Sequence, residues 1–359
     1  MAPGGSMAKL EETIQSIGPL DAAAMEKARA RQESLTKPRG SLGRLEELAT
    51  QLAGIQGRPI PRVERKAVIT MAADHGVARE GVSAYPVEVT GQMVANFLAG
   101  GAAINVLARQ AGARVVVVDM GVAVDLPAHP GLIDRKIGRG TRSLTRGPAM
   151  GRDEAIRAVE IGIEIVEAEV ARGLDVVATG DMGIGNTTPS SALVAVLVGA
   201  DVRAATGRGT GVDDAGLERK IEAIRRGIAV NRPDPADPLD VLNKLGGFEI
   251  AGLVGVILGA AASRTAVVVD GFISGAAALV AAGLAPAVRP YLIAGHRSVE
   301  AGHSLALQHL GLRPLLDLEM RLGEGTGAVL AMGILEAATG ILAEMATFAD
   351  AGVSDRPAG

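Results

Sequence analysis

Residues 175–189, which read DVVATGDMGIGNTTP, decide the fold that we expect for this chain. The first five of them form a short apolar run rich in valine, which predicts a strand buried on both faces of a sheet. The glycines that follow at once predict a tight turn. Thr188 suits the N-cap position of a helix and Pro189 suits its first turn, so a helix is predicted next. A strand, a glycine turn and a helix in this order form the repeating unit of a parallel α/β sheet.

Similar apolar runs recur on both sides of this stretch and predict further strands. They occupy residues 67–72, 114–119, 266–269 and 291–294. Helical patterns occupy residues 90–111 and residues 152–172, and Gly173 is placed to end the second of these helices. Strands that alternate with helices predict a mostly parallel sheet with helices on its faces.

The two ends of the chain carry a different pattern. Residues 8–56 and about 328–349 contain helical patterns without a strand. We therefore expect a smaller helical subdomain packed beside the sheet.

The composition of the 359-residue chain is that of a folded protein with few aromatic side chains. Charged residues make up 21% and hydrophobic residues 48% of the chain, which excludes a disordered polypeptide. Aromatic residues account for only 2%, and tryptophan is absent. We therefore expect a core of Ala, Val, Ile, Leu and Met packed closely against glycine.

The charge pattern and the cysteine content limit the partners and the location that we expect. The net charge is −4, and the chain has neither a Lys/Arg-rich block nor an aromatic ladder for stacking bases, so we expect no nucleic-acid partner. The absence of cysteine excludes disulfides, thiolate metal sites and cysteine nucleophiles, and it fits a reducing compartment. The N-terminus lacks the pattern of a signal peptide, so we expect a cytoplasmic protein.

Residues 1–6 (MAPGGS) are either an artificial addition or an extended start ahead of Met7. Two uncharged stretches, residues 182–200 and 271–288, are long enough to raise the question of a membrane span. Both contain glycine and polar breaks, and the second carries Pro286. The core of a soluble α/β protein explains them better, so we expect no membrane partner.

Three glycine-rich turns contain the residues best suited to chemistry. The first follows residue 179, and its N–H groups at a helix start suit a phosphate; the alternative is a capped structural turn. The second, residues 207–211 (GRGTG), precedes a helix that holds Lys220. Arg208 or Lys220 could pair with a phosphate, or both could be solvated surface charges. The third, residues 321–327 (RLGEGTG), places Glu324 at the start of an apolar helix, either as a general base or as a complement to the positive end of that helix.

Other chemistries receive little support from the sequence. His296 and His303 lie seven residues apart, which does not match a helical zinc pair, so we expect no metal site. A Gly-x-Ser-x-Gly elbow is absent, which argues against a hydrolase triad. No Gly-x-Gly-x-x-Gly motif follows an early strand with an acidic residue about 20 positions later, which argues against a nicotinamide-cofactor oxidoreductase.

Five motifs, taken in order along the chain, resemble one known family. They are KPRGSLGRLE at 37–46, ADHGV at 73–77, GIGNTT at 183–188, GGFEIAG at 246–252 and RLGEGTGA at 321–328. The series closely resembles the nicotinate-nucleotide–dimethylbenzimidazole phosphoribosyltransferases, which belong to the lower-ligand branch of cobalamin synthesis. The likeness extends from about residue 10 to residue 353, nearly the whole chain.

The resemblance implies a fold, an activity and a set of partners. The fold would be a Rossmann-like, mostly parallel sheet with helices on both faces and a small helical domain built from both chain ends. Residues 1–60 and 321–359 would form the small domain, and residues 61–320 the α/β domain with the nucleotide and base sites. The substrates would be nicotinate mononucleotide and 5,6-dimethylbenzimidazole, and the protein would be a homodimer with no metal or organic cofactor.

The resemblance also implies roles for particular residues. Glu324 would be the active-site base, and Asp181 a second acidic residue of the catalytic site. The acceptor base would lie against Ser83, Tyr85 and Gln92. The nucleotide would contact residues in the first two glycine turns and two positions beyond them, namely Gly183, Ile184, Gly185, Asn186, Thr187, Gly207, Gly209, Lys220 and Ser298.

Two positions depart from the family pattern, and two alternative functions stay open. Many members have Glu where this chain has Asp181, so the acid is kept but its reach is one methylene shorter. Members also commonly have Ser where this chain has Gly295. The alternatives are the same chemistry on another base, such as adenine or a phenol, and a non-catalytic regulator that binds nicotinate mononucleotide. The retained Glu324 argues against the regulator.

Overall fold

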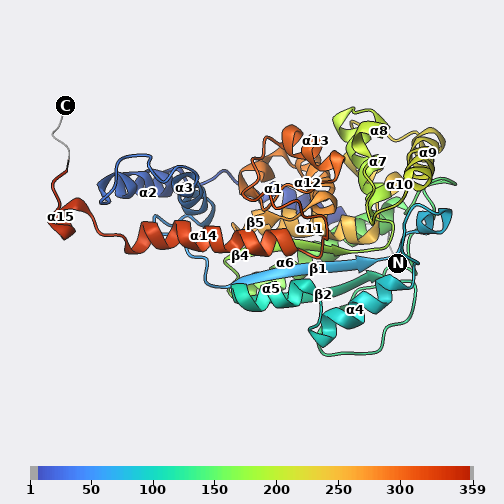
Figure 1. Ribbon diagram of the computed structural model, residues 1–359, viewed down its shortest axis with the longest axis horizontal. Coiled ribbons are helices and arrows are strands. Elements are labelled where there is room, and N and C mark those ends of the chain that lie inside the picture. Colours follow the sequence, from blue (N-terminus) through green and yellow to red (C-terminus); the bar gives the residue numbers. More distant parts are fainter. Residues whose placement is uncertain (1–6, 356–359) are drawn as a thin grey trace.

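The computed structural model describes residues 7–355, so the interpretation of residues 1–6 lies outside the described part of the chain. Six strands form one sheet in the order β3-β2-β1-β4-β5-β6, and each neighbouring pair is parallel (Figure 1). This order is that of a Rossmann-type doubly wound sheet. The predicted α/β class is therefore confirmed. The strands are β1 (Lys66–Ala73), β2 (Ala113–Gly121), β3 (Leu132–Asp134), β4 (Val176–Met182), β5 (Ala266–Val269) and β6 (Leu292–Ala294).

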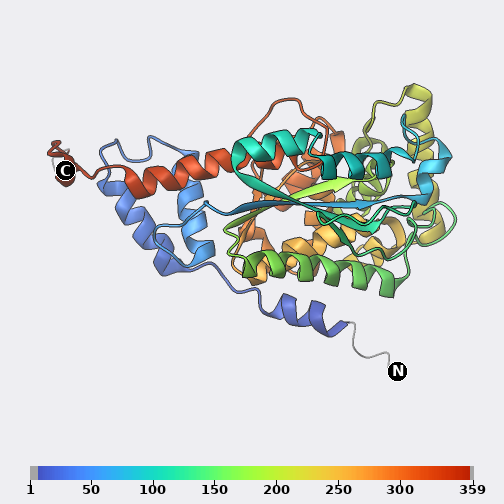
Figure 2. The ribbon, with the colours of Figure 1, turned by 90° about the horizontal axis from the view of Figure 1, so that it is seen from below.

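Helices cover both faces of the sheet (Figure 2). One face carries α4 (Val89–Ala99), α5 (Ala103–Ala111) and the first part of α14 (Thr326–Glu344). The other face carries α11 (Phe248–Ala262), with α6 (Arg152–Ala171) and α12 (Phe272–Leu284) beside it. The remaining helices of the α/β part are α7 (Thr187–Val198), α8 (Val202–Ala205), α9 (Asp214–Asn231), α10 (Pro238–Leu245) and α13 (Ala301–Leu310), with 3-10 turns η1 (Gly76–Glu80) and η2 (Pro286–Tyr291).

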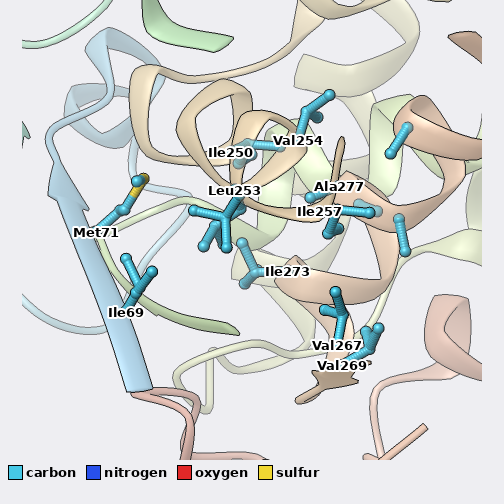
Figure 3. Close-up of a cluster of buried hydrophobic side chains, with 14 of the residues drawn as sticks. Ile69, Met71, Ile250, Leu253, Val254, Ile257, Val267, Val269, Ile273 and Ala277 are labelled. Carbon is cyan, nitrogen blue, oxygen red and sulfur yellow. The ribbon is translucent and has the colours of Figure 1, made fainter. Parts of the chain in front are cut away.

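The core consists of aliphatic side chains and closely packed glycines, as the composition predicts. Figure 3 shows Ile69 and Met71 of β1 facing Ile250 and Leu253 of α11. Helices α6 and α11 approach so closely that a Cβ added at Gly162 would overlap the carbonyl oxygen of Gly252. A larger residue has no space there, so this part of the core is filled by close approach of the two helix backbones at glycine and not by large aromatic side chains.

A smaller helical unit lies beside the sheet and brings together helices from the N-terminal and C-terminal parts of the chain (Figure 1). It contains α2 (Ala22–Ser34), α3 (Arg44–Gln56), the last part of α14 and α15 (Phe348–Ala351). The guanidinium of Arg31 donates hydrogen bonds to the carbonyl oxygens of Leu342 and Ala343, at 2.5 and 2.9 Å. Helix α1 (Met7–Gln15) packs instead against α6 and α11 of the sheet part (Figure 2). The domain boundaries at residues 60 and 320 stay predictions.

Three details differ from the sequence-based expectations. The helix expected over residues 90–111 is two helices, because Gly100 adopts a left-handed conformation, with φ of 77°, and ends α4. Helix α7 begins at Thr187 with Asn186 as its N-cap, so the prediction of Thr188 as the cap is wrong by two positions. The edge strand β3 was not predicted, because three residues are too short to show a periodic pattern.

Two segments of the described chain are apolar and long enough to cross a membrane by length and composition alone, Val89–Ala111 and Thr326–Glu344. The first is the α4–α5 pair, and the second packs against β4 and β5 of the sheet.

Candidate active site

The main cleft opens where the strand order reverses, at the carboxyl ends of β1 and β4. Ligands bind at this switch point in open α/β sheets because the loops from neighbouring strands diverge there. The cleft has a volume of about 660 Å³ and is lined by all three turns that the sequence singles out. The first turn contributes Gly183 and Ile184, the second Gly209 and Thr210, and the third Gly323 and Glu324.

The first turn joins β4 to α7 and brings Asp181 against the start of the helix. Asn186 donates from Nδ2 to the Asp181 carboxylate at 2.9 Å, which fixes both side chains. The N–H of Ile184 donates to the hydroxyl of Thr90 at 3.1 Å, and Gly185 has φ of 88°, a conformation that favours glycine. The turn is thus held rigidly with the N-terminus of α7 at the cleft.

The third turn has an unusual backbone. Gly323, Glu324 and Gly325 have φ values of 84°, 64° and 96°, so three consecutive residues are left-handed. Glycine tolerates this region without strain, whereas a glutamate there is strained by about 1 kcal/mol or more. Strain of this kind persists where the surrounding structure imposes it, and it concentrates at functional sites.

The Glu324 side chain is 4% exposed and lies at the wall of the cleft. Its Oε2 accepts a hydrogen bond from the N–H of Ile104, in the first turn of α5, at 3.2 Å. The positive end of its own helix, α14, is instead occupied by Asp270, which accepts from the N–H of Ala328 at 2.9 Å. The interpretation of Glu324 as a simple complement to its own helix is therefore wrong.

Several buried carboxyl groups share this end of the sheet, and each disfavours the charge of the others. Burial, together with the charges of Asp270, Glu249 and Glu324, raises the pKa of Asp181 to about 8, although the hydrogen bond from Asn186 lowers it. Burial also raises the pKa of Glu324, the backbone N–H that it accepts from lowers it, and the charge of Asp270 raises it. Groups with raised pKa values are suited to accept and release protons near neutral pH.

Lys220 lies one layer behind the cleft with 0% exposure. Its ammonium donates to the hydroxyl of Thr187 at 2.7 Å and to the carbonyl oxygen of Gly207 at 3.0 Å. Burial lowers the pKa of Lys220 to about 8, against the charge of Glu300, which raises it. A cation is therefore fixed beneath the first residue of α7, next to the N–H groups of the helix start.

The structure brings most of the sequence-predicted site residues together. Asp181 and Glu324, the nucleotide candidates Gly183, Ile184, Asn186, Thr187, Gly209 and Ser298, and the base candidate Tyr85 all line the cleft. Gly185 and Gly207 belong to the turns behind its wall, and Lys220, on α9, donates to the carbonyl oxygen of Gly207.

Two base-site candidates lie outside the cleft wall. The hydroxyl of Ser83 is 3.1 Å from that of Thr210, a cleft residue, whereas Gln92 is exposed on α4. The assigned roles of all these residues stay predictions.

Sequence reasoning missed four polar residues of this region. Arg321 and Glu300 line the cleft, and each contacts Gly209: Arg321 donates to its carbonyl oxygen at 3.3 Å, and Glu300 accepts from its N–H at 2.9 Å. His296 lines the cleft and Asp270 lies behind it. Arg321 stands in a motif that the sequence singles out, so its position could have been a signal; the others depend on contacts between distant segments.

Within residues 7–355, no group of three or more His, Cys, Asp and Glu side chains is arranged to hold a metal ion.

Comparisons with known proteins define the class of this protein. The family model described as phosphoribosyltransferase matches residues 17–353. The fold, with a cleft at its switch point, is thus that of a phosphoribosyltransferase.

Individual relatives define the family more narrowly. The nicotinate-nucleotide–dimethylbenzimidazole phosphoribosyltransferase of Desulforudis audaxviator (strain MP104C) is 64% identical over 345 residues, which cover 96% of this chain and 98% of the relative. The protein of the same name from Roseiflexus sp. (strain RS-1) is 64% identical over 350 residues, covering 98% and 99%. The crystal structure of the protein of that name from Thermus thermophilus has a TM-score of 0.89 and 50% identity, covering 94% of this chain and 100% of that chain. The chain belongs to the nicotinate-nucleotide–dimethylbenzimidazole phosphoribosyltransferase family.

Proposed function

We propose that this protein transfers the phosphoribosyl group of nicotinate mononucleotide to 5,6-dimethylbenzimidazole and releases nicotinate. The product is α-ribazole 5′-phosphate, and the reaction serves the assembly of the cobalamin nucleotide loop. The observation that carries the proposal is the buried Glu324 carboxyl group, fixed in a left-handed turn at the wall of the cleft. The names of relatives that match nearly the whole chain support the same reaction.

The chemistry needs one base and little else. Nicotinate is joined to the ribose C1′ through a positively charged ring nitrogen, so when this bond breaks its electron pair leaves a neutral ring nitrogen. The acceptor attacks C1′ through one ring nitrogen, from the face opposite nicotinate, which converts the β-nucleotide into an α-nucleotide. The other nitrogen of the acceptor loses its proton to the Glu324 carboxylate. A positioned general base of this kind contributes about 10²–10⁴-fold to the rate.

The phosphate fits the positive end of α7. Helix N-termini bind phosphate because their first N–H groups have no partner within the helix. Thr187 lies there, Lys220 supplies a cation beneath it, and Arg321 supplies a second cation at the wall of the cleft. A phosphate fixed at one end of the cleft holds the ribose C1′ in line with the bound acceptor. This alignment lowers the entropic cost of bringing the two reactants together.

The flat acceptor fits the apolar part of the same cleft. Tyr85, Val89 and Met93 come from α4 and the segment before it, whereas Met182 ends β4 and Phe272 begins α12. These side chains present apolar surface of the kind that small-molecule sites use for binding area, while the few polar groups fix orientation.

The test is a two-substrate assay with chromatographic and mass detection of nicotinate and α-ribazole 5′-phosphate. We expect both products to form only when dimethylbenzimidazole is present. Adenine and a phenol, offered in parallel, distinguish the same chemistry on another acceptor. Binding of nicotinate mononucleotide, with no nicotinate released from it in the presence of any acceptor, would instead identify a regulator.

We also propose that the protein acts as a homodimer in the cytoplasm. The family resemblance supports the dimer, and the cysteine-free chain fits a reducing compartment. Light scattering of the purified protein checks the dimer, and fractionation of producing cells checks the compartment. A monomer, or recovery of the protein outside the cytoplasmic fraction, would contradict the corresponding part.

A further inference from the structure

A buried carboxylate that the mechanism does not use lies directly beneath the turn that carries Glu324. Asp270 follows β5, has 0% exposure, and accepts hydrogen bonds from the N–H groups of Gly325, at 3.2 Å, and Ala328, at 2.9 Å. We propose that Asp270, held in place by His296, is a positioning residue that fixes the Glu324 turn and sets the pH range in which Glu324 acts as a base. This inference rests on the proposed function.

The geometry shows how Asp270 controls the turn. Its bond to Gly325 holds the peptide unit that directly follows Glu324. On the other side, the N–H of Glu324 donates to the carbonyl oxygen of Asp181 at 3.2 Å, and the hydroxyl of Thr70 donates to the carbonyl oxygen of Glu324 at 3.2 Å. Since a left-handed glutamate is strained, these contacts are what keep its backbone in place. Asp270 is the only one of them that acts through an ionisable side chain.

His296 fills the space on the other side of Asp270. Its Nε2 lies 3.6 Å from Oδ1 of Asp270, and both side chains are buried. A Cβ added at Gly327 would overlap the imidazole ring, so the ring and the first turn of α14 are in direct contact. His296 therefore packs against both the carboxylate and the helix, and leaves Asp270 little freedom to turn away.

The charges around the two carboxyl groups can be followed element by element. Glu324 faces the N–H of Ile104 on α5 and the carboxylate of Asp270 after β5. Asp181 on β4 faces Asp270, Glu324 and Glu249, with Asn186 as its hydrogen-bond donor. Burial raises the pKa of Asp270, while His296 and the N–H groups at the start of α14 lower it.

The negative charge of Asp270 raises the pKa of Glu324, and this determines the direction in which the pH profile moves when the charge is removed. The base is active as a carboxylate, so activity is lost as pH falls through its pKa. Removing the negative charge of Asp270 lowers the pKa of Glu324, and the acidic limb of the rate profile must move to lower pH.

The experiment compares the pH dependence of kcat/KM for dimethylbenzimidazole in the wild type, Asp270→Asn and Asp270→Ala. Asn carries no charge and keeps one of the two oxygens that separately accept from Gly325 and Ala328, so the acidic limb should move down by about one pH unit. Ala removes the oxygen as well, so kcat should fall about tenfold or more at every pH, while KM for the nucleotide changes little.

Asp119→Asn is the matched control. Asp119 is also a buried aspartate near the end of a strand, and it accepts from the N–H groups of Gly121 and Val122 at 3.0 and 2.8 Å, but it lies within β2. The Asp119→Asn substitution should change the unfolding midpoint without moving the acidic limb of the pH–rate profile.

The Asp270→Asn comparison is repeated in an Asp181→Asn background, so that a shift can be assigned to Glu324 and not to Asp181. A shift in both backgrounds supports the inference. If the limb stays in place, or moves only when Asp181 is present, the inference is overturned.

Failure of the inference can be separated from failure of the proposed function. A wild type that releases no nicotinate with any acceptor refutes the function. An active wild type in which Asp270→Asn behaves like Asp119→Asn refutes only the role of Asp270.

Discussion

Replacing Glu324 by Gln separates its role as a base from its role in the turn. Gln has nearly the same volume, and its amide oxygen can still accept the hydrogen bond from the N–H of Ile104, which is 3.2 Å long in the wild type. The left-handed backbone, with φ of 64°, is held by its neighbours and imposes the same strain on either side chain. The substitution therefore removes the proton acceptor and leaves the cleft in shape.

The size of the effect follows from the chemistry of that proton. Loss of a positioned general base lowers kcat by about 10²–10⁴-fold. This range corresponds to about 3–5 kcal/mol in the activation barrier. The affinity for nicotinate mononucleotide should change by less than about threefold, because binding of this substrate in its ground state does not depend on proton transfer to Glu324. In the wild type, the rate should fall as pH falls through the raised pKa of Glu324, and this limb should be absent from the residual activity of Glu324→Gln.

Single-turnover release of nicotinate measures the chemical step, and calorimetric titration measures binding of the nucleotide. Glu160→Gln is the matched control, because burial also raises the pKa of Glu160 but this residue lies on α6, outside the cleft. A kcat within about threefold of the wild type in Glu324→Gln would refute its assignment as the base.

Three further predictions follow from the geometry. Lys220→Met removes a buried cation beneath the phosphate site and should weaken nucleotide binding about 10–100-fold. Because the pKa of Lys220 is about 8, nucleotide binding to the wild type should also weaken as pH rises through that value. Equal nucleotide affinities below and above this pH would contradict the role of Lys220 in binding the phosphate. Gly162→Ala forces a methyl group against the carbonyl oxygen of Gly252 and should cost about 3 kcal/mol of unfolding free energy. Gly333→Ala, at an exposed helical site with nothing within 4 Å, should instead stabilise by about 0.5–1 kcal/mol, and equal midpoints of the two variants in denaturant would count against the packing argument. Burial raises the pKa of Asp181 from 3.8 to about 8, so the folded state holds a proton that the unfolded state releases, and stability should fall as pH rises between these values. Asp181→Asn should weaken that dependence, and an unchanged slope of unfolding free energy against pH would oppose the assignment.

The sequence predicted the fold where a local pattern determines the structure. Strands such as β1 and β5 are continuous apolar runs, a pattern typical of strands that are buried on both faces of a parallel sheet. The division of residues 90–111 into two helices was missed because apolar periodicity continues across Gly100 and Gly101. Strand β3 forms because β2 offers a free edge, and three residues carry no pattern of that pairing.

The site was predictable to the extent that its residues stand in glycine turns at strand ends. Glu324 and the α7 turn were found in this way, and the parallel sheet brings their strand ends together. Asp270 and His296 could not be found, because their contact with α14 depends on segments more than 20 residues apart that only the folded chain joins. Lys220 was a candidate from the sequence, but its burial beneath α7, which makes it a fixed cation and not a surface charge, could not be predicted.

The most direct test of the central claim is the base-dependent release of nicotinate from nicotinate mononucleotide. With 5,6-dimethylbenzimidazole present, the purified protein should form nicotinate and α-ribazole 5′-phosphate in equal amounts, and neither should form without the base. Measurable nucleotide binding with no product from dimethylbenzimidazole, adenine or a phenol would contradict the account.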